Sequence, residues 1–178
     1  MTLDSIMPKP SRKMTYLAQY IFFVLALFAF SSGVAHAQRG GGALERLAGH
    51  WGGSGTIDLT NGTHERLRCR ASYDLLAERH SVELNIRCAS DSYNFDLFGK
   101  VILSGHSVSG SWSESTRSVA GTLSGTADGD RIQVHAVSAG FSANLALTTR
   151  GDHQSVLIRT PDPSAGIKGA TINLRRSR

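Results

Sequence analysis

The chain has 178 residues, a net formal charge of +5 and only two cysteines. This length suits one domain with its own core, and the modest charge argues against a nucleic-acid-binding protein, which clusters its basic residues on one face. No Cys-x-x-Cys pair is present in the sequence, which excludes the redox motif built on that spacing.

The N-terminal segment has three zones in a fixed order. Lys9, Arg12 and Lys13 precede an apolar run from Ile21 to Phe30, and the small-residue site Ala35-His36-Ala37 follows. This order is typical of a secretory signal peptide. A membrane-spanning helix needs about 20 mostly apolar residues, so an uncleaved anchor is the less favoured alternative. We therefore expect a signal peptide over residues 1–37, a single all-β domain over 38–178, and no transmembrane span after cleavage.

After one or two helical turns near residues 42–48, the pattern changes to strands. The first strand is expected near His50–Leu59, and Asn61-Gly62 is a strong hairpin signal. The second, near 65–75, and the third, near 82–88, alternate between apolar and polar residues, which is typical of strands with one buried face.

Cys69 and Cys88 fix how the second and third strands pair. Two cysteines in an exported chain most often form a disulfide, because the compartment is oxidising. If Cys69 faces Cys88, every other facing pair on that side is apolar as well, and a slip by one residue would reverse the faces. The sequence thus predicts a cross-strand disulfide in this register. The facing pairs are Ala71 with Ile86, Tyr73 with Leu84, and Leu75 with Val82.

Further short alternating segments, separated by turn signals, complete the chain. The domain is expected to have eight to ten strands in total, and most connections between them are short enough for hairpins. The simplest closure is an antiparallel up-and-down barrel, which removes edge strands; a two-sheet sandwich is the alternative. The later strands are expected near residues 93–97, 100–103, 108–112, 119–126, 131–137, 141–147, 154–159 and 170–174.

Catalytic and metal-binding patterns are weak. The six histidines after residue 37 show no i, i+2 or i, i+4 spacing, so no metal site is expected. No Gly-x-Ser-x-Gly elbow is present. Glu65 and Glu114 are the acids on apolar faces, where each would be either a polar ligand contact or a strand-end residue in water. We expect a protein that is not an enzyme and needs no cofactor.

The inner face of the expected barrel is rich in aromatic residues, which favours binding of a small apolar or amphipathic ligand. An interior filled by these aromatic side chains, with no pocket of about 300 Å³ or more, would contradict this interpretation. The candidate ligand-binding residues are Trp51, Tyr73, Tyr93, Phe95, Trp112, Glu114 and Phe141.

An arginine stripe marks the outer face of the second strand. Arg66, Arg68 and Arg70 alternate there, and Arg87 faces Arg70 in the register above. Such a patch suits an acidic envelope component, although a solvated outer face balanced by Asp74 and Glu83 is the favoured interpretation. The alternative function is therefore a protein-interaction module, such as a protease inhibitor or an envelope-associated structural factor. We expect a monomer.

Two resemblances add to this reading. The segment Leu47-Ala48-Gly49-His50-Trp51 resembles the Gly-x-Trp signature of lipocalins and other calycin barrels, which implies a short helix before the first strand and a Trp that plugs the barrel base. The region after residue 37 also resembles a family of small exported alphaproteobacterial proteins of unknown function, which implies the periplasm or exterior of a Gram-negative bacterium. The matching pieces are Glu65–Ala71, Arg87–Tyr93, Gly110–Glu114 and Gly140–Ala143.

Overall fold

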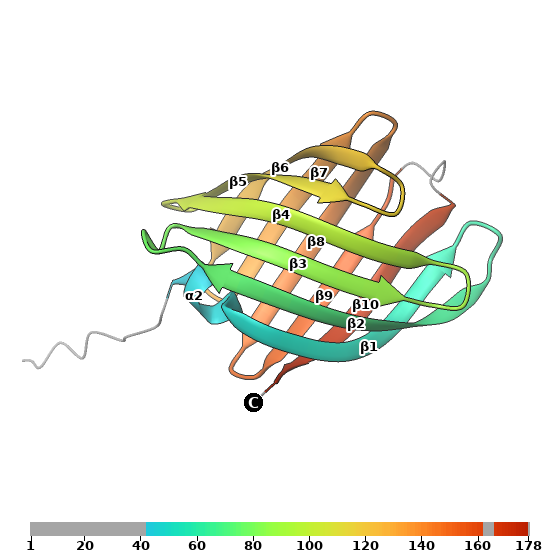
Figure 1. Cartoon of the computed structure of the whole chain (residues 1–178), viewed down its shortest axis with the longest axis horizontal. Helices are drawn as coiled ribbons and strands as arrows, with labels where there is room; N and C mark the ends of the chain where they lie inside the picture. Colours follow the sequence, from blue (N-terminus) through green and yellow to red (C-terminus); the bar gives the residue numbers. More distant parts are fainter. Residues whose placement is uncertain (1–41, 162–165, 178) are drawn as a thin grey trace, which may run out of the picture. The chain divides into compact units, whose positions relative to one another are not determined.

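The computed structural model describes residues 42–161 and 166–177. The expected signal peptide, residues 1–37, lies outside this part of the chain. The unit Gly40–Arg178 is described by itself. It contains one short helix and ten strands (Figure 1). These are α2 (Ala43–Leu47), β1 (Gly49–Leu59), β2 (His64–Leu75), β3 (Ser81–Ala89), β4 (Asn94–Ser104), β5 (Ser107–Glu114), β6 (Val119–Asp128), β7 (Arg131–Ser138), β8 (Phe141–Arg150), β9 (His153–Arg159) and β10 (Ile167–Arg176).

The strands form one closed antiparallel barrel. Each strand pairs with its neighbours in sequence, and β10 closes the ring by pairing with β1. This confirms the up-and-down barrel and excludes the two-sheet sandwich. Because every strand has a partner on both sides, the sheet has no free edge.

The register between β2 and β3 is the predicted one. Cys69 faces Cys88, Tyr73 faces Leu84, and the two cysteines are joined in a disulfide bond. The alternation of β2 therefore places its apolar residues inside the barrel and its arginines outside. This one hairpin sets which face of the whole sheet points inward.

The fourth strand differs from the sequence prediction. Two short segments near 93–97 and 100–103 were expected, but β4 runs unbroken from Asn94 to Ser104. Gly99 lies on the inner face between Leu84 and Trp112. A Cβ there would lie 2.9 Å from the carbonyl oxygen of Ser111. The glycine thus lets β4 pass close to its neighbour instead of ending it.

Other inward-facing glycines allow the same close approach around the barrel. At each of them a Cβ atom would lie 2.1 Å or less from a carbonyl oxygen of the adjacent strand. Real Cβ atoms do not approach so closely, so these positions accept only glycine without a backbone shift. The barrel closes with its tight curvature because these side chains are missing. The positions are Gly53, Gly55, Gly110, Gly121 and Gly125.

Helix α2 covers one end of the barrel, which is called the α2 end below. Leu44 and Leu47 of this helix are buried, and Trp51 at the start of β1 is buried beside them. Glu45 accepts hydrogen bonds from the backbone N–H of Gly42 and from Arg79 in the β2–β3 loop, the latter at 2.9 Å. Within the two described ranges, no helix is long and apolar enough to cross a membrane.

Candidate ligand cavity and surface hollow

The barrel interior contains an apolar cavity of about 260 Å³. It extends from Leu47 at the α2 end to Phe95, Phe141 and Ile167 near the opposite end. Aliphatic and aromatic side chains from all ten strands line it, and polar groups are few. Of the lining side chains, only Tyr73, Trp112 and Thr160 carry an O–H or N–H group.

The cavity exists because the inner side chains do not fill the barrel. Several inward-facing aliphatic residues are only half-buried, although no solvent-facing surface of the barrel includes them; Leu84, Leu123, Val134 and Leu145 are examples. Their remaining accessible surface faces the cavity.

Four of the seven residues predicted to bind ligand line this cavity: Tyr73, Phe95, Trp112 and Phe141. Trp112 and Phe141 meet edge to face, with ring centroids 5.9 Å apart. The Trp112 Nε1–H donates to the carbonyl oxygen of Thr122 at 3.1 Å, so its polar atom is satisfied within the protein. The two rings therefore present carbon to the cavity.

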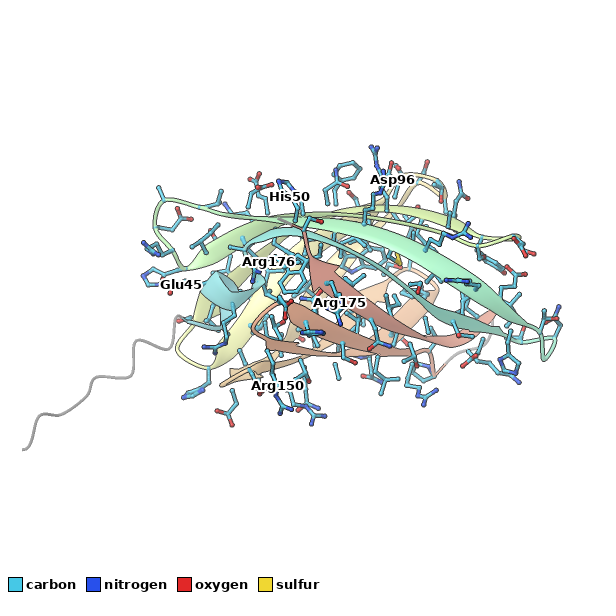
Figure 2. The ribbon with its side chains drawn as sticks, turned by 90° about the horizontal axis from the view of Figure 1, so that it is seen from below. Glu45, His50, Asp96, Arg150, Arg175 and Arg176 are labelled. Carbon is cyan, nitrogen blue, oxygen red and sulfur yellow. A yellow bond between two sulfur atoms is a disulfide. The ribbon has the colours of Figure 1, made fainter. Side chains whose placement is uncertain are left out.

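Trp51 does not line the cavity. It closes the α2 end, as the resemblance to the calycin signature implied. Its Nε1–H donates to the carbonyl oxygen of Leu47 at 2.7 Å, and the guanidinium of Arg176 lies 4.3 Å from the centre of its ring. Figure 2 shows Arg176 beside α2. Trp51 thus packs between helix α2 and the two strands that close the barrel, β1 and β10.

Tyr93 and Glu114 also lie outside the cavity lining, at the end opposite α2. Tyr93 stacks on Phe95 with ring centroids 6.0 Å apart. The guanidinium of Arg117, in the β5–β6 turn, lies over both rings, at 5.4 Å and 5.0 Å from their centres. Arg117 is partly exposed and pairs with the Glu114 carboxylate at 3.4 Å, so this ion pair lies beside a ring that lines the cavity.

Glu114 is a structural anchor for the β5–β6 turn. Its carboxylate accepts hydrogen bonds from the backbone N–H groups of Asp96, Thr116 and Arg117 and from the Thr116 hydroxyl. Burial by itself would raise the pKa of this carboxyl, but these donors together outweigh burial and lower the pKa to about 2. All of this hydrogen bonding is internal, so the prediction that Glu114 contacts a ligand finds no support in its geometry. Glu65 similarly binds the β3–β4 loop through Ser90 and Ser92.

A buried polar chain lies at the α2 end of the barrel interior. The Tyr73 hydroxyl donates to Gln154 Oε1 at 3.2 Å, and Gln154 Nε2 donates to Thr149 Oγ1 at 3.2 Å. Burial raises the pKa of the Tyr73 phenol, which therefore stays protonated. Gln154 was not predicted from the sequence, because a polar glutamine interrupts the apolar positions that mark the inner face of β9. Only its inward position two residues before Val156 could have revealed it.

The predicted outer arginines lie together, as the alternation required. Arg66, Arg68, Arg70 and Arg87 line a surface hollow of about 860 Å³ over β1 to β4. Arg175 of β10 lies next to them, because Gly52 pairs with Arg175 on one side and Arg70 on the other. The sequence reasoning missed Arg175, since only closure of the barrel brings β10 beside β1.

Histidines and possible metal ligands are scattered over the described residues. The six histidines from His50 to His153 are all exposed, and no cluster of three or more His, Cys, Asp or Glu side chains in these ranges is placed to hold a metal ion. The chemistry that this barrel presents is apolar enclosure inside and positive charge outside.

Comparison with known proteins agrees on the fold. No family model and no curated protein matches the sequence. Among solved structures, Rv2717c from M. tuberculosis superposes with a TM-score of 0.62 at 13% identity, covering 78% of this chain and 99% of that one. The S-type phycobiliprotein lyase CPES from Guillardia theta superposes with a TM-score of 0.56 at 13% identity, covering 76% and 90%. At such identity the likeness shows a shared barrel fold alone.

Proposed function

We propose that this protein is an exported, non-enzymatic barrel that binds a small apolar or amphipathic molecule in its interior. The observation that carries this proposal is the apolar cavity of about 260 Å³ inside a closed barrel. An apolar space of this kind stays dry and accepts an apolar guest, as an engineered cavity of about 150 Å³ does with benzene.

The volume sets the size of the guest. Scaling from benzene in about 150 Å³ gives a ligand of about ten non-hydrogen atoms. The cavity is slightly below the usual lower bound of about 300 Å³ for ligand pockets, so a small linear or monocyclic molecule fits the space better than a large fused-ring one.

The polar groups at the two ends favour an amphipathic guest. The ring of Tyr73 lines the cavity near the α2 end, where its hydroxyl donates to Gln154, and Arg117 lies beside Phe95 at the other end. A molecule with an aliphatic body and one acidic or hydroxyl group matches this arrangement. Export through the signal peptide would place this binding in the cell envelope, and the disulfide between Cys69 and Cys88 suits such a compartment.

A chain-length series tests the proposal. Linear 1-alkanols from butanol to dodecanol are titrated into the protein by isothermal calorimetry. Each added methylene contributes about 0.8 kcal/mol while it enters the cavity, so affinity should rise about fourfold per carbon and stop rising near nine carbons. Such a cut-off measures the cavity, because surface adsorption continues to strengthen with length.

A matched pair of variants on β7 provides the control. Val134 lines the cavity, whereas Val137 is exposed on the outer face of the same strand. Val134→Phe fills part of the cavity and should weaken 1-octanol binding at least tenfold, while Val137→Phe should leave it unchanged. Absence of saturable binding at every chain length, or equal binding by both variants, would contradict the proposal.

A further inference from the structure

Five arginines gather on the outer wall formed by β10, β1, β2 and β3, apart from the internal cavity. Arg175, Arg70 and Arg87 lie in one row across the strands, since Gly52 pairs with both Arg175 and Arg70, and Arg70 pairs with Arg87. Arg68 and Arg66 continue along β2 on the same outer face. Figure 2 labels Arg175 in this region. These five residues are called the arginine face below.

Within the described part of the chain, most of this charge has no counter-ion. Arg87 pairs with Asp96 at 3.1 Å. Arg66, Arg68, Arg70 and Arg175 make no hydrogen bond or ion pair with any residue in 42–161 or 166–177. Five like charges against one carboxylate repel one another, and this repulsion is relieved when an anion binds between them.

The arginine face surrounds a hollow with a floor of small residues. Gly52, Ser54 and Ala89 line it together with four of the arginines. A Cβ at Gly52 would meet no atom within 4 Å, so the space above this residue is open. An anion can therefore approach the backbone of β1 while the arginine side chains reach it from the sides.

The dimensions of the face indicate more than one anionic group. Arg66 and Arg70 are four residues apart on β2, which is about 13 Å along the strand, and β10 lies three strand spacings from β3, about 14 Å across the sheet. The planar guanidinium group of arginine can donate two parallel N–H hydrogen bonds to two oxygens of one phosphate. We propose that the arginine face binds a ligand with two or more phosphate groups.

Sodium tripolyphosphate is the direct probe, titrated by calorimetry at constant ionic strength with citrate as an anion of similar charge that lacks phosphate. We expect saturable one-to-one binding that citrate does not match. The triple variant Arg66→Gln, Arg68→Gln, Arg70→Gln should weaken it strongly, since each arginine contributes about fivefold to binding of an anionic surface.

The matched control removes three positive charges elsewhere. Arg131→Gln, Arg159→Gln and Lys168→Gln together change the net charge by the same amount at exposed strand positions outside the arginine face. This variant should bind tripolyphosphate within twofold of the unmodified protein. Equal weakening in both triple variants, or citrate binding as tight as tripolyphosphate, would overturn the proposal.

Vesicles separate the two sources of phosphate. Sedimentation is measured with phosphatidylglycerol vesicles and with uncharged phosphatidylcholine vesicles. Binding to the first alone, lost in the arginine-face variant, identifies neighbouring lipid head groups as the source. Tripolyphosphate binding without vesicle binding identifies a free polyphosphate, and failure of both probes overturns the proposal. None of these readouts depends on the internal cavity, so they stand apart from the alkanol series.

Discussion

The indole Nε1–H of Trp51 donates a hydrogen bond to the carbonyl oxygen of Leu47, 2.7 Å away, and both residues are buried. This bond joins helix α2 to the first strand. Arg176, near the end of β10, lies over the same indole ring and donates to the backbone carbonyls of Arg46 and Ala48. The helix that closes the barrel is thus held from β1 and from β10 at once.

Trp51→Phe should loosen that closure. The variant loses one buried hydrogen bond, leaves the Leu47 carbonyl without its partner, and weakens the contact with Arg176. We expect the free energy of unfolding in urea to fall by about 2 kcal/mol. Amide hydrogen exchange should also become faster at Arg46 and Ala48, whose N–H groups bond within the helix. Unchanged exchange at both sites would show that the helix does not depend on Trp51.

Gly53→Ala should destabilise the barrel, and Gly52→Ala should not. A Cβ at Gly53 would lie 2.1 Å from the carbonyl oxygen of Asn173, whereas one at Gly52 would meet nothing within 4 Å. The backbone shift forced at Gly53 should cost about 2 kcal/mol or more of unfolding free energy, and the Gly52 variant should gain slightly through strand propensity. Thermal unfolding of the two variants measures this difference at neighbouring positions of the same strand.

Glu114→Gln should change how stability depends on pH. The pKa of Glu114 in the folded protein is lowered to about 2 from an ordinary value of 4.5. Its carboxylate therefore stabilises the fold above pH 4.5, and this contribution is lost as the pH falls from about 4.5 toward 2. It amounts to about 3 kcal/mol at neutral pH.

Unfolding in urea at several pH values measures this effect. At pH 7 the Gln variant should be less stable by that amount, because the backbone N–H groups of Asp96, Thr116 and Arg117 lose a charged acceptor. The difference between the two proteins should shrink below pH 4.5. A difference that stays constant from pH 7 to pH 2 would show that the ionised carboxylate has no special role.

The barrel could be predicted because the pairing of two neighbouring strands determined which face of the whole sheet points inward. Two cysteines in alternating segments fixed the register of β2 and β3, and the register decided which face of every later strand pointed inward. Turn signals such as Asn61-Gly62 then separated the strands. The β2–β3 register and the turns depend on residues that are close in the sequence, so local sequence patterns predict them.

The remaining features depend on contacts that only the closed barrel creates. Arg175 joins the arginine face because β10 pairs with β1, and Gln154 meets Tyr73 from a strand 81 positions away. Glu114 alternates like a cavity residue, yet the β5–β6 turn folds back over it. The volume of the central cavity could not be predicted either. Alternation predicts which side chains point inward, but it does not predict whether these side chains fill the interior.

Arg117→Gln should separate the polar from the apolar part of ligand binding. Octanoate and 1-octanol share an aliphatic chain and differ in the charge of one end. If the charged end of an amphipathic guest lies near Phe95, the Arg117 guanidinium 5.0 Å from that ring attracts it. Two unit charges at such a distance gain about 1 kcal/mol in a strongly screening environment, so the variant should bind octanoate about fivefold more weakly and 1-octanol equally well.

The control for this test is Arg131→Gln, which removes the same charge from an exposed position at the start of β7, at the α2 end. It should leave both affinities unchanged. If Arg117→Gln weakens octanoate and octanol together, the residue acts through the packing of Tyr93 and Phe95 and not through its charge. If it weakens neither while 1-octanol binds as expected, the polar end of the guest lies toward the Tyr73 hydroxyl, and Tyr73→Phe should then weaken 1-octanol binding in its place.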